Sequence, residues 1–160
     1  MMDIGSGRGY PASALSNFAP HPFVVDGVSC ASAEGFLQSL KFKNVEMQQE
    51  VCKLVGRAAK FRGKKKNWQR EQKLYWKGQE IDRHSPEYQV LLDRAYNALA
   101  KNEGFKKALI ASRGAVLGHS MGKRDPKQTV LTVAEFVRRL HRIRKSLQKD
   151  EQTHLQQRVR

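Results

Sequence analysis

The feature that most constrains this fold is a set of segments in which apolar residues recur at helical spacing. The clearest spans 85–104, where a capping serine and a proline at the first helical position lead into the periodic residues. Its apolar side comprises Tyr88, Leu91, Leu92, Ala95 and Leu99. A second segment begins with a capping box, Thr132 and Glu135, and continues as the apolar file Val133, Phe136, Val137, Leu140, Ile143 and Leu147. Such segments predict a mostly α protein.

Shorter segments add to this prediction. Ser32 is a suitable N-cap for a helix that buries Phe36, Leu37 and Leu40. The stretch EMQQEVCKLVGRAAK (46–60) predicts one further helix, and WQREQKLYWKG (68–78) a short one ending at Gly78. FRGKKKN (61–67) is expected to be a charged loop. Gly104 is expected to break the 85–104 helix, before a further turn or two in 105–112 and a short strand or extended segment from 114.

The only clear β signal is a hairpin. Apolar residues bracket Asp26-Gly27 in FVVDGVSC, and such a dipeptide suits a tight hairpin turn. At 160 residues the chain can bury one core without disulfides or metals. We therefore predict a compact single domain over 1–148, mostly α with a small hairpin or short sheet, and a polar tail over 149–160 that frays.

The charge is unusual. The chain carries 30 Lys and Arg against 15 Asp and Glu, a formal net charge of +15. The excess concentrates in 53–77 and in 123–160, which predicts two basic patches. Solvated helix faces are one explanation, and anionic partners are the other. Two patches together favour phosphate-rich ligands, with nucleic acid as the expected partner.

Other functional classes find little support in the sequence. Cys30 and Cys52 form no CxxC pair and the five histidines show no ligand spacing, so neither a disulfide framework nor a metal site is expected, and no cofactor is indicated. No apolar run approaches the ~20 residues that a membrane span needs. We expect a cytoplasmic protein with no membrane partner.

One polar file could carry chemistry. Glu34, Gln38 and Lys41 fall at i, i+4 and i+7 and share one side of the helix that begins after Ser32. A carboxylate in the first turn of a helix lies near free N–H groups, and Lys41 adds positive charge, so Glu34 is expected to be ionised. An ionised Glu34 suits a base or a stabiliser of a developing cation. The alternative is the wet side of a surface helix.

The segment LSNFAPHPFVVDGVSCASAEGFLQSLKF resembles the opening signature of the YbiA-like, or NADAR (NAD- and ADP-ribose-associated), family. The matching positions are Ser16-Asn17-Phe18, Pro22, Asp26-Gly27, Glu34, Gln38 and Lys41-Phe42. The resemblance continues more weakly to about Leu147 and implies a compact, mostly α fold. Two features depart from the family: Ala33 and Gly35 stand where better-known members have Ser and His, and GHSMGKRDPKQTVLTVAEF replaces a Trp-Gly-Asp-Gly run.

The resemblance implies an N-glycosidase that cleaves a ribose C1′–N bond. The implied substrate is ADP-ribose on guanine in nucleic acid, or else a phosphorylated ribosyl intermediate of riboflavin synthesis. Glu34 would be the catalytic carboxylate. The implied substrate-binding residues are Asn17, Phe18, Gln38, Lys41, Lys60, Trp68, His119 and Asp125, the last two by position only. A non-catalytic module that binds ADP-ribose, NAD or nucleic acid is the competing class.

Overall fold

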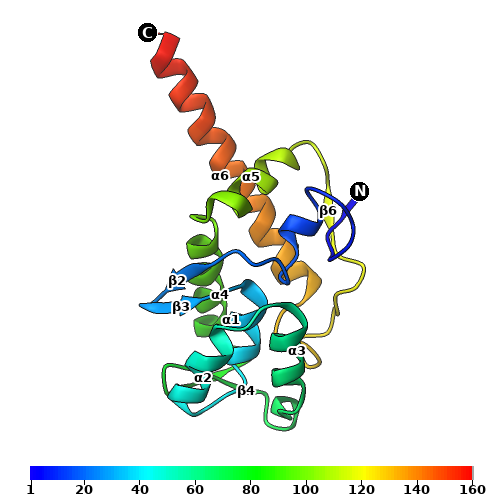
Figure 1. Cartoon of the computed structure of the whole chain (residues 1–160), viewed down its shortest axis with the longest axis vertical. Coiled ribbons are helices and arrows are strands. Elements are labelled where there is room, and N and C mark those ends of the chain that lie inside the picture. Colours follow the sequence, from blue (N-terminus) through cyan, green and yellow to red (C-terminus); the bar gives the residue numbers. More distant parts are fainter. Residues whose placement is uncertain (160) are drawn as a thin grey trace.

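The computed structural model of the chain describes residues 1–159, and within them six α-helices and three two-stranded sheets are present (Figure 1). The helices are α1 (Ala33–Ser39), α2 (Val45–Cys52), α3 (Gly56–Lys64), α4 (Pro86–Leu99), α5 (Glu103–Ala111) and α6 (Val133–Val159). The sheets pair β1 (Met2–Asp3) with β6 (Leu117–Gly118) in parallel, and β2 (Phe23–Val25) with β3 (Val28–Cys30) and β4 (Lys73–Trp76) with β5 (Gln79–Asp82) antiparallel. Ser13–Leu15 and Trp68–Arg70 form short 3₁₀ turns. The mostly α class is confirmed.

The short helix α1 lies in the middle of the core. Phe36, Leu37 and Leu40 on its apolar side are all at most 3% exposed. It packs against α2 and α3, while α4 packs against β2 and contacts α6. Gly35 allows the closest approach, because a Cβ there would lie 2.5 Å from the carbonyl oxygen of Leu54. A side chain at position 35 would collide with the α2–α3 connection, which accounts for glycine at this departure from the family pattern.

The predicted helix starts and the predicted hairpin are confirmed. The Ser32 hydroxyl accepts a hydrogen bond from the Gly35 N–H at 3.0 Å, and the Ser85 hydroxyl accepts from Tyr88. In the turn between β2 and β3, Asp26 has φ 50° and Gly27 has φ 78°, as a two-residue hairpin turn requires. The local sequence therefore determines these boundaries.

The single helix predicted over 46–60 is wrong. The chain forms two helices instead, and α3 begins at Gly56, whose φ of 56° interrupts the helical backbone. The helix α3 then continues to Lys64, through most of the stretch expected to be a charged loop. The apolar period continues across the break, and this continuity is why the pattern alone suggests one helix.

The short helix predicted over 68–78 is also wrong beyond its first turn. Strands β4 and β5 form a hairpin whose turn residues, Lys77 and Gly78, have φ 51° and 83°. Leu74 and Trp76 alternate with less buried neighbours, which is the two-residue period of a strand. The alternation is visible in the sequence but covers only the four residues of β4, too few to distinguish a strand from a helix.

Two predictions near helix ends need correction. The helix α4 ends at Leu99, and Asn102 caps α5 by accepting from the Phe105 N–H, so the break precedes Gly104, which lies inside α5. Residues 149–159, expected to fray, continue α6 as an exposed helix that projects from the body (Figure 1). Gln, Glu, Lys and Leu in this stretch have high helix propensity.

Candidate active site

The segment that precedes the first hairpin is tied to the start of α1. The backbone N–H of Glu34 donates to the carbonyl oxygen of Asn17 at 2.9 Å. The Asn17 side-chain oxygen accepts from the hydroxyl of Tyr96 on α4 at 2.7 Å. Phe18, half-buried, lies beside Gly56, where a Cβ would be 3.7 Å from the ring. Asn17 and Phe18 therefore lie next to the helix end that carries Glu34.

Gln38 connects α1 to α3. Its Nε2 donates to Glu34 Oε1 at 2.8 Å, and the residue is 7% exposed. A Cβ on Gly63 of α3 would lie only 1.8 Å from Gln38 Oε1, so position 63 accepts no side chain unless Gln38 moves. Among residues 1–159, Gln38 Oε1 is a buried oxygen with no hydrogen-bond partner. Gln38 is therefore buried and its neighbours Glu34 and Lys41 are half-buried, so the interpretation of these residues as the wet side of a surface helix is wrong.

Cationic groups surround the Glu34 carboxyl. Burial raises the pKa of Glu34, and the Gln38 hydrogen bond and the charges of Lys41, Lys60 and His119 oppose that shift without cancelling it. The sequence argument considered the helix end and Lys41, which favour the ionised form, but not desolvation, which raises the pKa of Glu34. The expectation of an ionised Glu34 stays a prediction. A carboxylate with a raised pKa is a stronger base, so a base role is compatible with this environment.

Lys41 and Lys123 extend the positive field. Burial lowers the pKa of Lys41, the Glu34 charge opposes this effect, and Lys123 adds to the lowering. Lys41 is half-buried, whereas Lys60 and Lys123 are exposed. The charges of Lys41 and Lys60 act on the Glu34 carboxyl and that of Lys123 acts on Lys41. Such a group of ammonium side chains favours an anionic ligand, because phosphate oxygens can be bound by several lysines at once.

His119 belongs to this cluster although nothing in the helical patterns placed it there. It follows β6, its Nδ1 lies 2.8 Å from the Ile4 carbonyl oxygen, and its ring packs edge-on against Phe136 with centroids 5.5 Å apart. A carbonyl accepts, so Nδ1 carries a proton in both the neutral and the charged ring, and Nε2 is the nitrogen at which a proton is gained or lost. His119 can therefore exchange a proton through Nε2.

Two of the predicted binding residues lie in other environments. Trp68 is 5% exposed and packs within the hydrophobic core, so its interpretation as a stacking platform is wrong. Asp125 is exposed, and its carboxylate accepts from the Lys127 backbone N–H at 2.9 Å, which shapes a turn of the loop before α6. No contact of Asp125 connects it to the Glu34 cluster within residues 1–159.

The sequence analysis missed Tyr96, Gly63 and Lys123. Tyr96 was absent from the apolar side predicted for its helix, yet it is 2% exposed and its hydroxyl holds Asn17. Gly63 lies inside a helix, where glycine is unfavourable, and that anomaly is a signal of close approach. Lys123 had no distinguishing pattern.

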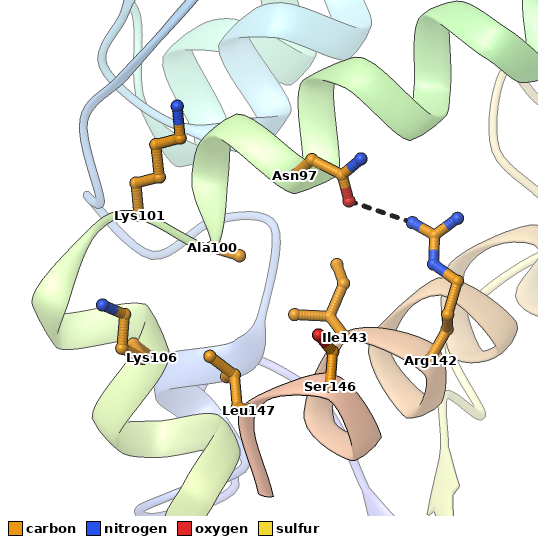
Figure 2. Close-up of a pocket in the computed structure, with 8 residues that line it drawn as sticks. All are labelled: Asn97, Ala100, Lys101, Lys106, Arg142, Ile143, Ser146 and Leu147. Atoms are coloured by element: carbon orange, nitrogen blue, oxygen red, sulfur yellow. Dashed lines mark hydrogen bonds between the residues drawn. The ribbon is translucent and has the colours of Figure 1, made fainter. Parts of the chain in front are cut away.

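A separate hollow of about 480 Å³ lies between α4, α5 and α6. Figure 2 shows the three cations Lys101, Lys106 and Arg142 around it, with Arg142 bonded to Asn97. Its floor is apolar, formed in part by Ile143 and Leu147, and its eight lining residues include no carboxylate. Acid–base chemistry therefore points to the Glu34 cluster rather than to this hollow.

The fold is YbiA-like. The NMR structure of the E. coli protein YbiA matches with a TM-score of 0.58 at 18% sequence identity, over 94% of this chain and 89% of YbiA. The chain belongs to the bacteriophage protein GP30.3 family, whose profile matches residues 9–145. It is 43% identical over 151 residues to an uncharacterized 17.1 kDa protein from the Gp30–rIII intergenic region of Enterobacteria phage T4, covering 91% of this chain and 98% of that relative.

Two features are absent from residues 1–159. That part of the chain has no cluster of three or more His, Cys, Asp or Glu side chains that could hold a metal ion. None of its helices combines the length and the apolar character that crossing a membrane would take.

Proposed function

We propose that this protein is an N-glycosidase that hydrolyses a ribose C1′–N bond, and that it removes ADP-ribose from guanine in nucleic acid. One observation carries the proposal: Glu34 is a half-buried carboxyl of raised pKa that is hydrogen-bonded to Gln38 and lies in the positive field of Lys41, Lys60 and His119. The YbiA-like fold and the Ser-Asn-Phe, Glu, Gln and Lys-Phe pattern support it.

In the proposed reaction, the C1′–N bond breaks and its electron pair leaves with the nitrogen, which takes up a proton. The sugar becomes oxocarbenium-like, and a carboxylate close to C1′ stabilises that positive charge. Glu34 accepts a proton from the attacking water, whose oxygen bonds to C1′. Water is consumed, and free ADP-ribose and the unmodified base are released.

The surrounding residues take supporting roles in this proposal. Lys41, Lys60 and Lys123 bind the diphosphate, because each offers an ammonium donor. Gln38 positions Glu34 through the 2.8 Å bond. Asn17 and Phe18 contact the sugar or the base, and His119, in its imidazolium form, supplies the proton to the leaving nitrogen from Nε2–H.

The test uses an oligonucleotide that carries ADP-ribosylated guanine, with release of ADP-ribose followed by mass spectrometry. Glu34→Gln should slow release by about 10²- to 10⁴-fold, the usual contribution of a positioned acid or base. Glu46→Gln is the matched control, because Glu46 also lies in the first turn of a helix but is exposed. It should leave the rate unchanged.

Three results would contradict the proposal in part or in whole. Equal release by wild type and Glu34→Gln would remove Glu34 from the reaction. Release from a phosphorylated ribosyl-pyrimidine but not from the oligonucleotide would replace the substrate with a riboflavin-pathway intermediate. Binding of ADP-ribose without turnover of either substrate would identify a non-catalytic module.

A further inference from the structure

The outer side of α3 carries positive charge that the fold leaves largely uncompensated. Arg57, Lys60, Lys64 and Lys65 are all exposed. Among residues 1–159, the 53–66 segment has one carboxylate contact, between Arg62 and Glu50 at 3.9 Å. Like charges three and four residues apart on a helix repel each other, so an anionic partner that binds this face would relieve the repulsion and stabilise the helix.

The second basic patch differs, because several of its cations are used inside the fold. Arg139 Nε lies 2.9 Å from Asp93, and Arg142 contacts the same carboxylate at 3.2 Å. Arg144 donates to the carbonyl oxygens of Ser112 and Ala115 at 2.8 and 2.9 Å. The charges of α3 are therefore the better candidates for an external ligand.

An exposed aromatic ring lies within the α3 charges. Phe61 is 64% exposed, and the ammonium of Lys65 lies 5.1 Å from the centre of its ring. Arg57 and Lys65 lie four residues before and after it and so share its side of the helix. A ring flanked by cations is the arrangement that stacks on unpaired bases while the cations bind phosphates.

This face adjoins the Glu34 cluster. Gly63, on the inner side of α3, lies against Gln38, and the Lys60 charge acts on the Glu34 carboxyl. A strand that lies along α3 would therefore pass the proposed catalytic carboxyl near Lys60, in the middle of the helix.

We propose that the outer face of α3 binds single-stranded nucleic acid, with Phe61 stacking on a base and Arg57, Lys60, Lys64 and Lys65 binding phosphates. The proposal rests on the proposed function, for which it supplies the surface that holds the substrate strand. A duplex would offer phosphates but no unstacked base to Phe61, so single strands are preferred.

The first test measures fluorescence anisotropy of a labelled, unmodified single strand of about 16 nucleotides, a length in the range that one small domain covers. Arg57→Glu/Lys64→Glu should weaken binding by about tenfold or more and lower the slope of log affinity against log salt by about 1.4, since two phosphate contacts are lost. Lys107→Glu/Lys149→Glu is the control, because both lysines are exposed and the change in net charge is identical. It should have much less effect.

The second test isolates stacking. Phe61→Leu keeps an apolar side chain but removes the aromatic face, and should weaken binding of the single strand by about fivefold or more without changing the salt slope. Tyr10→Leu is the control, since Tyr10 is 67% exposed and lies outside α3. A loss for Phe61→Leu that exceeds the loss for Tyr10→Leu supports the proposal.

Several results would overturn the α3 proposal. Equal losses in the two charge-reversed variants would indicate attraction by net charge alone. The stacking role would be excluded if a duplex bound as tightly as the single strand, or if Phe61→Leu left the affinity for the single strand unchanged. Binding to vesicles rich in phosphatidylserine without binding to the oligonucleotide would replace the partner by a lipid surface.

The two proposals can fail separately. If only the α3 proposal fails, hydrolysis of ADP-ribosylguanosine, a substrate with no strand attached, still depends on Glu34. If only the glycosidase proposal fails, no ADP-ribose is released, yet the anisotropy results still follow the α3 variants.

Discussion

Two glutamates occupy the first turn of a helix and lose solvent on folding, Glu135 buried and Glu34 half-buried, yet their carboxylates differ in how fully they are hydrogen-bonded. Glu135 begins α6 and accepts four hydrogen bonds: two from Arg83, at 2.7 and 3.1 Å, one from Gln89 at 2.6 Å and one from the Thr132 N–H at 2.8 Å. Glu34 begins α1 and accepts one side-chain hydrogen bond, from Gln38. Sequence position alone does not distinguish them.

The pKa values move in opposite directions as a result. Burial raises the pKa of Glu135, but the hydrogen bonds from Arg83 and Gln89 outweigh it, and the net pKa lies below its ordinary value of 4.5. Burial dominates at Glu34, so its pKa lies above 4.5. A fully bonded carboxylate joins elements of the fold, whereas an under-compensated carboxylate retains basicity and can accept a proton or stabilise a cation. The comparison separates a structural carboxylate, Glu135, from the one that we propose to be functional, Glu34.

The largest effect on stability is expected at the structural carboxylate. Glu135→Gln leaves the Arg83 guanidinium, 1% exposed, without its counter-charge. Removing one member of a buried ion pair costs about 3–5 kcal/mol of unfolding free energy. Chemical denaturation measures this loss, and a cost below about 1 kcal/mol would show that the pair contributes no more than a surface one.

Gly63→Ala should disturb the functional carboxylate indirectly. The new Cβ would lie 1.8 Å from Gln38 Oε1 and would force Gln38 away from Glu34. We expect a loss of about 1–3 kcal/mol from overpacking, and a loss in turnover of about 10²-fold from misplacement of the carboxylate. Gln38→Ala/Gly63→Ala provides the control: it makes room for the methyl group, so stability should recover while turnover stays low.

Glu34→Gln should stabilise the protein while it slows the proposed hydrolysis. The neutral amide removes the cost of desolvating a charge and can still bond to Gln38. Substitutions that relieve an unfavourable active-site group typically gain about 0.5–2 kcal/mol. A gain in unfolding free energy at neutral pH would agree with the raised pKa, and a loss would indicate that Glu34 is held as firmly as Glu135.

The smallest expected effect is the dependence of the unfolding free energy on pH. The contributions of Glu34 and Glu135 to it should have opposite signs. Because the folded-state pKa of Glu34 is raised, wild type loses stability as pH rises from 4.5 through that folded value. The advantage of Glu34→Gln is therefore complete above the folded pKa and vanishes below 4.5. Glu135 contributes stability above 4.5 and loses it as pH falls through its lowered pKa. Unfolding at several pH values between 3 and 7 tests both signs, since these values bracket the ordinary carboxyl range.

Local rules predicted the elements whose evidence lies within a few residues. Ser32, Ser85 and Thr132 cap helices as expected, and Asp26-Gly27 turns the hairpin. The rules failed where a periodic pattern continued across a backbone break, as at Gly56, or where a short strand was taken for a helix, as in β4. Apolar period cannot report a single residue with positive φ.

In the candidate site, too, local patterns predicted some features correctly and misjudged others. The spacing of Glu34, Gln38 and Lys41 along one helix was sufficient to place them together, and the proposed role of Glu34 began from that spacing. Trp68 was misjudged, because a tryptophan beside basic residues suits both a stacking platform and a core anchor until its 5% exposure is known. His119 could be named as a binding residue only from its position in the chain.

The sequence by itself determined the helix caps, the hairpin turn, the mostly α class and the alignment of Glu34 with Gln38, because each depends on contacts between residues near one another in the chain. Only the tertiary structure decided that Gly63 encloses Gln38, that the charge of His119 acts on the Glu34 carboxyl and that of Lys123 on Lys41, and that Arg83 neutralises Glu135. Burial and charge compensation depend on segments up to about a hundred residues apart, and they set the pKa of each glutamate.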